Sequence, residues 1–304
     1  MYKKHCVDTV SSARRCFPGD SVEEVFFDRN REGSLEPAFL LLFSKEERLR
    51  ICLLASGSRG NSLFVEAGGT KILVDAGLSA REIVARLASI EVSASEIDGI
   101  IISHEHNDHI RGVGALARKF DLPVLISYPA SREAAGHLHS VRLVEFESGC
   151  SFQFRELLID PFPITHDTAD PVGLVFESRE GKVGVATDLG LVTRLVKEKL
   201  KGCRALVLES NHDEEMLVNG PYPWHLKQRI KSRHGHLSNA EAAELFAEVM
   251  GPDLEMLFLA HLSEVNNHPE VALEAFRKPL TGCTACAPRV VVGSQRQVSE
   301  VFQR

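Results

Sequence analysis

From Arg50 onward, the chain alternates short apolar runs with turns rich in glycine and polar residues. Runs of four or five residues rich in Ile, Leu and Val are typical of buried strands, whereas apolar residues that recur three or four positions apart indicate helices. Helical spacing covers 80–87, 110–120 and 191–200. The predicted core strands are 51–54, 63–66, 71–75, 100–103, 123–127, 183–187, 205–209, 256–260 and 290–292. Strands that alternate with helices in two similarly built halves predict a single α/β domain.

The boundaries of this domain follow from where the pattern begins. Residues 1–48 carry alternating charges, and their apolar residues recur with neither helical nor strand spacing. We therefore expect an N-terminal extension without an assigned role, followed by the domain at 49–304. One helix start is marked by a capping box, in which the side chains of Ser238 and Glu241 accept hydrogen bonds from each other's backbone N–H groups. That box places His236 just before a helix N-terminus.

Composition excludes several classes of protein. With 44% hydrophobic and 25% charged residues, the chain has the balance of a soluble globular protein. No apolar run approaches the roughly 18 to 20 residues that a membrane helix requires. The first residues are too polar for a signal peptide, and the seven scattered cysteines do not form a disulfide framework, so we expect a cytoplasmic protein. The lone C-x-x-C of Cys283 and Cys286 is weak evidence for a redox or zinc site, and we interpret it as a loop before the last strand.

The residues that carry chemistry cluster directly after the buried strand at 99–102. Four side chains of types that commonly bind metals fall within six residues there: His104, His106, Asp108 and His109. In an extended chain His104 and His106 point to one side, whereas Asp108 and His109 can turn toward a neighbouring position as the chain enters a helix. This spacing predicts a site for two metal ions. Imidazole and carboxylate ligands suit zinc, and also manganese or iron, so the residues do not select one metal.

This segment matches in full the H-x-H-x-D-H signature of the metallo-β-lactamase superfamily, which the chain resembles. The resemblance implies a four-layer αββα sandwich, in which two mixed β-sheets are flanked by helices. It also implies that Asp75 orients the ligands from behind them and that Asp188 bridges the two ions, with a shared hydroxide as the nucleophile. By that resemblance, one ion is held by His104, His106, His166 and Asp188, and the other by Asp108, His109, Asp188 and His261.

A second pair of residues resembles the proton relay of ribonuclease Z. In that family a glutamate after a strand and a histidine in a Gly-His-Ser segment form the relay, and Glu209 and His236 stand at the matching positions here. The resemblance implies that Glu209 orients His236, which protonates the leaving oxygen as a general acid. Alternatively, His236 only caps the following helix. The superfamily also hydrolyses other esters. Among these substrate classes, the resemblance to the ribonuclease Z relay favours a phosphodiester.

Two further segments are candidates for binding a nucleic acid. The stretch 224–234 is the densest basic segment of an acidic chain and holds its only tryptophan, which could stack on a base. An ordinary solvated helix face would account for these charges equally well. The glycine-rich turn at 57–62 could hold a phosphate, although a plain hairpin loop has the same composition. The predicted substrate contacts are Ser58, Arg59, Asn61, His212, Trp224, Lys227 and Arg233.

Taken together, the motifs between residues 54 and 267 resemble the YycJ (WalJ) group of bacterial metallohydrolases. That resemblance implies a dinuclear, metal-dependent phosphodiesterase that acts on DNA as a 5′ to 3′ exonuclease, with a link to DNA repair. Three alternatives stay open: a ribonuclease, a small-molecule ester or lactone hydrolase, and a metal-binding regulatory protein without catalysis.

The net charge of −7 argues against a generally basic nucleic-acid-binding surface, but it does not exclude a local one. Two divalent ions would bring the total to about −3 and concentrate positive potential at the site. A nucleic acid is therefore the expected partner, with DNA favoured over RNA, and no membrane is expected.

Overall fold

The computed structural model describes residues 48–282 and 286–304, in which the strands form two seven-stranded sheets. In spatial order, the first sheet consists of β14 (Phe302–Gln303), β1 (Arg50–Ala55), β2 (Ser62–Ala67), β3 (Thr70–Val74), β4 (Gly99–Ile101), β5 (Val124–Ser127) and β6 (Leu143–Phe146). The second consists of β13 (Arg289–Val292), β12 (Met256–Ala260), β11 (Ala205–Glu209), β10 (Gly181–Ala186), β9 (Val172–Ser178), β8 (Leu157–Pro163) and β7 (Phe152–Phe154). Both sheets mix parallel and antiparallel pairs, as expected.

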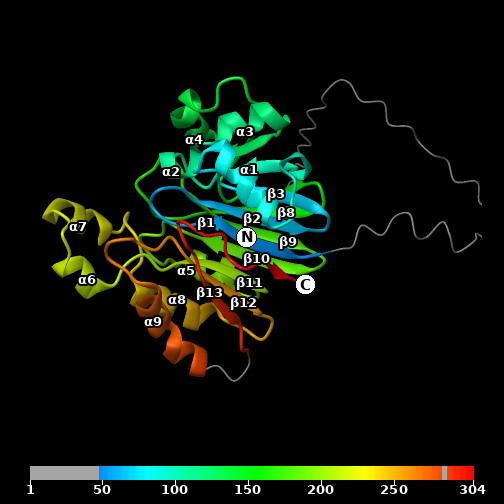
Figure 1. The fold of residues 1–304 in the computed structure, drawn as a ribbon. Helices are drawn as coiled ribbons and strands as arrows, with labels where there is room; N and C mark the ends of the chain where they lie inside the picture. The colour runs from blue at the N-terminus through cyan, green and yellow to red at the C-terminus, as the bar shows by residue number, and fades with distance from the viewer. Residues whose placement is uncertain (1–47, 283–285) are drawn as a thin grey trace, which may run out of the picture. The chain divides into compact units, whose positions relative to one another are not determined.

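Helices cover the outer face of each sheet (Figure 1). The first sheet is covered by α1 (Ala80–Ser89), α3 (Val113–Phe120) and α4 (Tyr128–Glu133), and the second by α5 (Arg194–Leu200), α8 (Asn239–Val249) and α9 (Pro269–Gly282). The other helices are α2 (Asn107–Ile110), α6 (Glu214–Asn219), α7 (Trp224–Ile230) and two 3₁₀ turns at Ala94–Glu96 and Ala134–Gly136. Within the described ranges, no helix combines the length and the apolar character needed to cross a membrane.

Apolar side chains from both sheets fill the space between them. Because side chains alternate across a strand, β1 sends Ile51 and Leu53 between the sheets and Leu54 under the helices. Both faces of such a strand are buried, which is why the central strands appear in the sequence as continuous apolar runs. The αββα sandwich implied by the sequence is confirmed.

The structure also shows where the sequence pattern was insufficient. Each predicted strand is present with its ends within two residues of the prediction, but the pattern did not identify β6, β7, β8, β9 or β14. The helix predicted at 110–120 is present as α3, but it begins at Val113 because α2 and α3 are separate. The chain breaks at Gly112, whose N–H donates to the carbonyl of Ala76 (2.7 Å), and a Cβ there would lie 2.1 Å from the carbonyl oxygen of Leu78. A long-range backbone contact therefore ends α2.

Other local predictions have mixed outcomes. The capping box is confirmed, since Ser238 Oγ accepts from the N–H of Glu241 (3.3 Å) and Glu241 Oε2 accepts from the N–H of Ser238 (2.8 Å). The extension predicted at 1–48 lies outside the described residues apart from Arg48, and of the C-x-x-C only Cys286 is described.

The turn after β3 packs directly against the backbone that carries Asp108 and His109. The N–H of Ala76 donates to the carbonyl of His109 (2.8 Å), and a Cβ on Gly77 would lie only 1.6 Å from the carbonyl oxygen of Asp108. Only glycine therefore fits at position 77, because the opposing atom is backbone and cannot move aside. This contact fixes the position of α2 relative to β3.

We expect Gly77→Ala to lower the free energy of unfolding of the metal-free protein by about 3 kcal/mol, since the added methyl group overpacks a backbone contact. Urea unfolding of chelator-treated samples measures this change. The matched control is Gly251→Ala, where a Cβ meets nothing within 4 Å and which should change stability by less than about 0.5 kcal/mol. Equal stability of the two variants would contradict the importance of this contact.

Candidate metal centre

The residues predicted to bind metal come together at one end of the two sheets. The first sheet contributes the segment that follows β4 and enters α2, and the second contributes the loops after β8, β10 and β12. These segments carry His104, His106, Asp108 and His109 from the first sheet, and His166, Asp188 and His261 from the second. The site therefore forms only when both halves of the domain are folded against each other.

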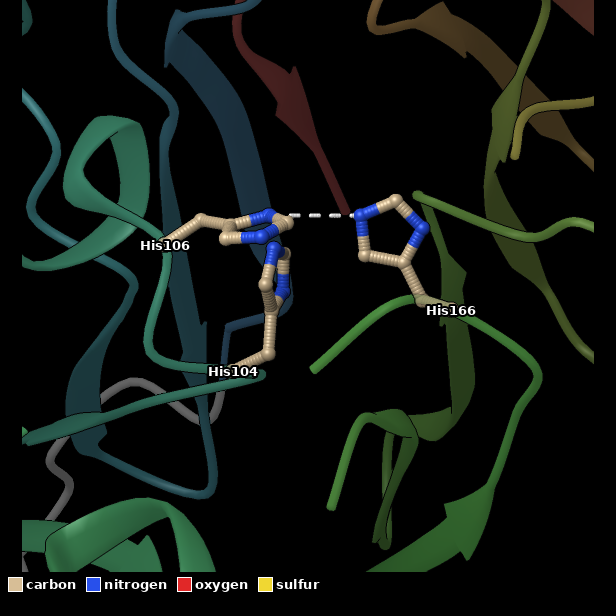
Figure 2. Close-up of side chains that lie close together, drawn as sticks. All are labelled: His104, His106 and His166. Carbon is tan, nitrogen blue, oxygen red and sulfur yellow. Dashed lines mark hydrogen bonds between the residues drawn. The ribbon is translucent and has the colours of Figure 1, made fainter. Parts of the chain in front are cut away.

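The side chains form four overlapping groups whose ligand atoms lie close enough to hold an ion, and two of these groups match the two ion sites implied by the sequence. In the first, ligand atoms of His104, His106 and His166 lie within 4.8 Å of one another, and Nδ1 of His106 is 3.3 Å from Nε2 of His166 (Figure 2). In the second, ligand atoms of Asp108, His109 and His261 satisfy the same distance limit. Each cluster has the size of a site for one ion.

Asp188 lies between the two clusters and is 2% exposed. Its Oδ1 is 3.8 Å from Nε2 of His166 in the first cluster and 3.5 Å from Nε2 of His261 in the second. Its Oδ2 is 3.4 Å from Nε2 of His109. One carboxylate thus reaches ligands of both clusters, which fits the bridging position that the sequence predicts for it.

Asp75 orients the ligands that come from the first sheet. Its Oδ2 accepts hydrogen bonds from Nδ1 of His109 (2.7 Å) and from the hydroxyl of Ser103 (2.7 Å), and Oδ1 accepts from the backbone N–H of Ser103 (2.8 Å). Because the Ser103 hydroxyl donates to Asp75, it accepts from Nδ1 of His104 (3.0 Å). These contacts place the proton of both rings on Nδ1 and leave Nε2 for an ion.

Glu209, at the end of β11, has the corresponding position in the second sheet and is fully buried. Its Oε1 accepts hydrogen bonds from Nδ1 of His236 (2.8 Å) and Nδ1 of His261 (3.0 Å). Its Oε2 accepts from the backbone N–H groups of Leu189 (2.9 Å) and Leu237 (3.1 Å). The four hydrogen bonds occupy this carboxylate, so we assign it to orienting two histidines, of which the sequence indicated only His236.

Several polar atoms that face the clusters have no protein partner. Among the described residues, none has the geometry to form a hydrogen bond with Nε2 of His104, Nε2 of His261 or Oδ2 of Asp188, although all three atoms are buried. A buried polar atom left unpaired costs about 1–3 kcal/mol, so such a group of atoms at one point indicates a ligand. Imidazole nitrogens and carboxylate oxygens are donors that fit divalent metals such as zinc. The residues present therefore fit the metal site that the sequence implies.

Burial and the neighbouring carboxylates shift the pKa values of the histidines in the site. Burial lowers the pKa of His104 well below its usual value, so this ring is neutral. Burial also disfavours the charged form of His109, but the carboxylates of Asp75 and Asp188 outweigh it and raise its pKa to about 9. Against the effect of burial, Asp188 likewise raises the pKa of His261 well above its usual value. An entering ion must therefore displace protons from His109 and His261.

Three of the site residues have a left-handed backbone conformation, with φ of 61° at Asp75, 58° at Asp188 and 56° at His261. Each follows a strand closely, and non-glycine residues adopt this conformation at a cost of order 1 kcal/mol or more. This conformation turns the chain immediately after each strand. The fold therefore accepts backbone strain at Asp75, Asp188 and His261, the positions that carry these site side chains.

A pocket of about 290 Å³ opens at the clusters and is lined by ligands from both of them and by His236. Of the predicted substrate contacts, Ser58 lines this pocket. Arg59 lies outside it, 71% exposed, with Nε 2.8 Å from Oε2 of Glu264. Trp224 and Arg233 are also exposed and do not line the wall, Trp224 at 69% exposure. For these three residues, contact with substrate stays a prediction.

The remaining predicted contacts have protein partners or are buried, and their contact with substrate stays a prediction. Asn61 Nδ2 lies 3.2 Å from Asp108 Oδ2 and 3.0 Å from His109 Nε2, so Asn61 contacts two of the predicted ligands. The ammonium group of Lys227 donates to two carbonyls at the end of α6, at 2.6 and 2.7 Å. His212 is 2% exposed and does not line the pocket. The partners of Asn61 are distant in sequence, whereas those of Lys227 lie only seven and nine residues before it.

The pocket wall also includes polar residues that were not among the individually predicted contacts, although two of them lie in the basic stretch 224–234: Asp167, Asn211, Tyr222, Arg229, His234 and Ser263. Helical spacing could have identified one of them. Leu226, Arg229 and Ile230 lie three and four positions apart and all line the pocket, whereas Lys227 lies on another side of α7. The apolar residues of the basic segment therefore mark the side of the helix that faces the site.

Comparisons with known proteins agree with this arrangement. The beta-lactamase superfamily domain matches residues 70–261. Exodeoxyribonuclease YycJ of Bacillus anthracis is 40% identical over 227 residues, which cover 74% of this chain and 86% of that protein. Exodeoxyribonuclease WalJ of Streptococcus pneumoniae is 37% identical over 225 residues, which cover 72% and 84%. The metallo-β-lactamase-fold protein YhfI of Bacillus subtilis has a similar structure, with a TM-score of 0.65 at 16% identity over 85% of this chain and 100% of that one.

We expect Asp75→Asn to lower the affinity for zinc about 10- to 100-fold, because His109 and Ser103 lose the acceptor that orients them. Competition with a chromophoric chelator measures this affinity. The matched control is Asp98→Asn, since Asp98 accepts from the backbone N–H of Lys71 (2.8 Å) and pairs with Arg155 (2.8 Å), away from the site. If both variants bind zinc as the unmodified protein does, Asp75 does not orient the ligands.

Zinc binding to the chelator-treated protein should release protons at pH 7.5. His109, with its pKa raised to about 9, is protonated at that pH, and an ion can bind its Nε2 only after a proton leaves. The release should decrease as the pH rises through about 9, because His109 is then neutral beforehand. Calorimetry in buffers of different ionisation enthalpy counts the protons, and a binding heat that is the same in all buffers at pH 7.5 would contradict this assignment.

Proposed function

Because the chain belongs to the beta-lactamase superfamily and, within it, to the family of the YycJ and WalJ exodeoxyribonucleases, we propose that it is a metal-dependent nuclease that removes nucleotides from the 5′ end of DNA. The observation that carries this proposal is the Glu209–His236 pair, which lies beside two clusters of metal-binding side chains in one pocket. Cleavage of a phosphodiester leaves an alkoxide that must gain a proton, and this pair can supply one.

The metal centre in this proposal holds two divalent ions, either zinc or else manganese or iron. The buried atoms without protein partners and the two three-residue clusters support that number. When bound, such ions lower the pKa of water toward neutrality and stabilise the charge that develops on a phosphate under attack. One ion is assigned to His104, His106, His166 and Asp188, and the other to Asp108, His109, Asp188 and His261.

His236 supplies the proton to the leaving oxygen. A carboxylate only accepts hydrogen bonds, so the contact of His236 Nδ1 with Glu209 fixes a proton on Nδ1 and leaves Nε2 as the atom that exchanges a proton with the substrate. Glu209 accepts this hydrogen bond as an ionised carboxylate. Burial opposes this charge, but His236 and His261 hold the pKa of Glu209 well below its usual range.

The choice of DNA, of the 5′ end and of a role in DNA repair in the cytoplasm rests on the family. The relatives that match most of the chain are named exodeoxyribonucleases. Ribonuclease activity is the second candidate, because RNA and DNA present the same scissile phosphodiester to the metal site. Hydrolysis of a small-molecule ester or lactone also releases an alkoxide that this pair can protonate, so the simple ester in the assay below separates that candidate. Metal binding without catalysis would leave the pair of Glu209 and His236 with no substrate to protonate.

We expect His236→Ala to lower kcat on DNA about 10²- to 10⁴-fold while the bound metal stays unchanged, because the variant removes the proton donor and no metal ligand. The assay uses protein loaded with zinc or manganese, DNA labelled at the 5′ or the 3′ end, matched RNA and a simple ester. Release of nucleotides from the 5′ end of DNA is the expected result.

The matched control is His268→Ala, since His268 is exposed and pairs with Glu270 at the start of α9, outside the pocket. This variant should cleave DNA at the unmodified rate. Faster cleavage of RNA than of DNA would establish the second candidate instead. If His236→Ala retains kcat and only lowers thermal stability, His236 is a helix-capping residue and the proposed chemistry fails.

A further inference from the structure

A guanidinium group stands on the pocket wall next to the first metal cluster. Arg229, in the last turn of α7, lines the pocket with its side chain 58% exposed, so it is open to an incoming substrate. In the described part of the chain, it is the only lysine or arginine among the lining residues. Arg59 pairs with Glu264 and Lys227 with carbonyls of α6, so these nearby cations are held elsewhere.

Asp167 holds Arg229 in one orientation. Nε of Arg229 donates to Oδ2 of Asp167 at 2.6 Å. The other carboxylate oxygen, Oδ1, lies 3.5 Å from Nε2 of His166 and 3.8 Å from Nε2 of His106. The carboxylate of Asp167 therefore connects the guanidinium group to the ligands of the first cluster.

The backbone also fixes Arg229 relative to the proton donor. The carbonyl of Ile230, the next residue, accepts a hydrogen bond from the backbone N–H of His236 (2.9 Å). The carbonyl of Gly235 accepts one from Nδ1 of His166 (3.2 Å), and a Cβ on Gly235 would lie 2.0 Å from the carbonyl oxygen of Ile230. Arg229, His236 and the ligand His166 thus belong to one closely packed unit.

Most of the hydrogen-bonding capacity of Arg229 is unused. A guanidinium group has five N–H donors in a planar fork, and the contact with Asp167 uses the one on Nε. Among the described residues, none accepts from its two terminal nitrogens. A fork of this kind matches two oxygens of a phosphate and holds them in a defined direction.

We infer that the two terminal nitrogens of Arg229 bind a phosphate of the nucleic acid, while Asp167 positions Arg229 through its Nε. The inference rests on the proposed function and deepens it, because it names the contact by which the strand is held at the metal centre. Asp167 is a positioning residue in this account. The competing explanation is purely structural, namely that the ion pair only attaches α7 to the loop after β8.

Binding of DNA at different salt concentrations separates the two explanations. Each phosphate contact to a single strand releases counterions and contributes about −0.7 to the slope of log K against log salt. The probe is a fluorescent single-stranded oligonucleotide with phosphorothioate linkages, which slow its cleavage, and the protein is the metal-loaded full chain. Metal content is measured for every variant, since Asp167 lies close to two ligands.

We expect Arg229→Gln to weaken binding about tenfold or more at low salt and to reduce the slope by about 0.7. Arg229→Lys keeps the charge and should keep the slope. Asp167→Asn should also keep the slope, because Arg229 still meets the phosphate. The matched control is Arg277→Gln, whose Nε pairs with Glu274 (3.2 Å) on α9 outside the pocket and which should bind as the unmodified protein does.

Two results would overturn the inference. Unchanged affinity and slope in Arg229→Gln would show that Arg229 does not touch a phosphate. Equal weakening by Arg229→Gln and Asp167→Asn, with the slope of the unmodified protein in both, would show that the pair only attaches α7. Binding of DNA by the unmodified protein without an effect of Arg229 leaves the proposed function intact, whereas failure of the unmodified protein to bind DNA overturns both.

Discussion

Two buried carboxylates, one from each sheet, hold four of the six histidines of the site, directly or through one serine, by hydrogen bonds to Nδ1. Asp75, after β3, orients His109 directly and His104 through Ser103, and Glu209, at the end of β11, orients His261 and His236. A carboxylate behind an imidazole fixes which nitrogen carries the proton and aims the other nitrogen outward. The metal clusters and the proton donor therefore depend on the same kind of contact, made once in each half of the domain.

This arrangement explains why an acidic protein can have an anionic substrate. Asp108, Asp188 and Glu209 concentrate negative charge at the pocket, where it would repel a phosphate in the absence of metal. The same charge raises the pKa values of His109 and His261, so the metal-free site is stabilised by protons that a metal replaces. Metal binding then offsets this local negative charge. Recognition of the nucleic acid and catalysis are thus linked through occupancy of the centre.

Four of the seven predicted metal ligands could be identified together from the sequence because they lie close to one another along the chain. His104, His106, Asp108 and His109 lie in one short segment, and the strand before it is marked by an uninterrupted apolar run that is buried on both faces. The break between α2 and α3 was not predictable, since it depends on a close approach of Gly112 to Leu78 in a different loop. β8 was missed because Pro161 and Pro163 interrupt its apolar pattern.

The substrate contacts show the same limit of local information. Asn61 and Lys227 have suitable chemistry for a phosphate, but the fold places each against groups that the sequence does not reveal as neighbours. Arg229 belongs to the same basic segment as Lys227, and it differs only in the side of α7 on which it lies. Residue type therefore gave the right segment, and the packing of α7 against the pocket decided which cation lines it.

The most direct test of the account is anomalous X-ray diffraction from crystals of the metal-loaded protein, recorded at the absorption edge of the bound metal. The account predicts two peaks, one among His104, His106 and His166 and the other among Asp108, His109 and His261, with Asp188 next to both. A single peak would contradict the two-ion centre. A peak held by Glu209 and His236 would contradict the proton relay, because these two residues would then be metal ligands.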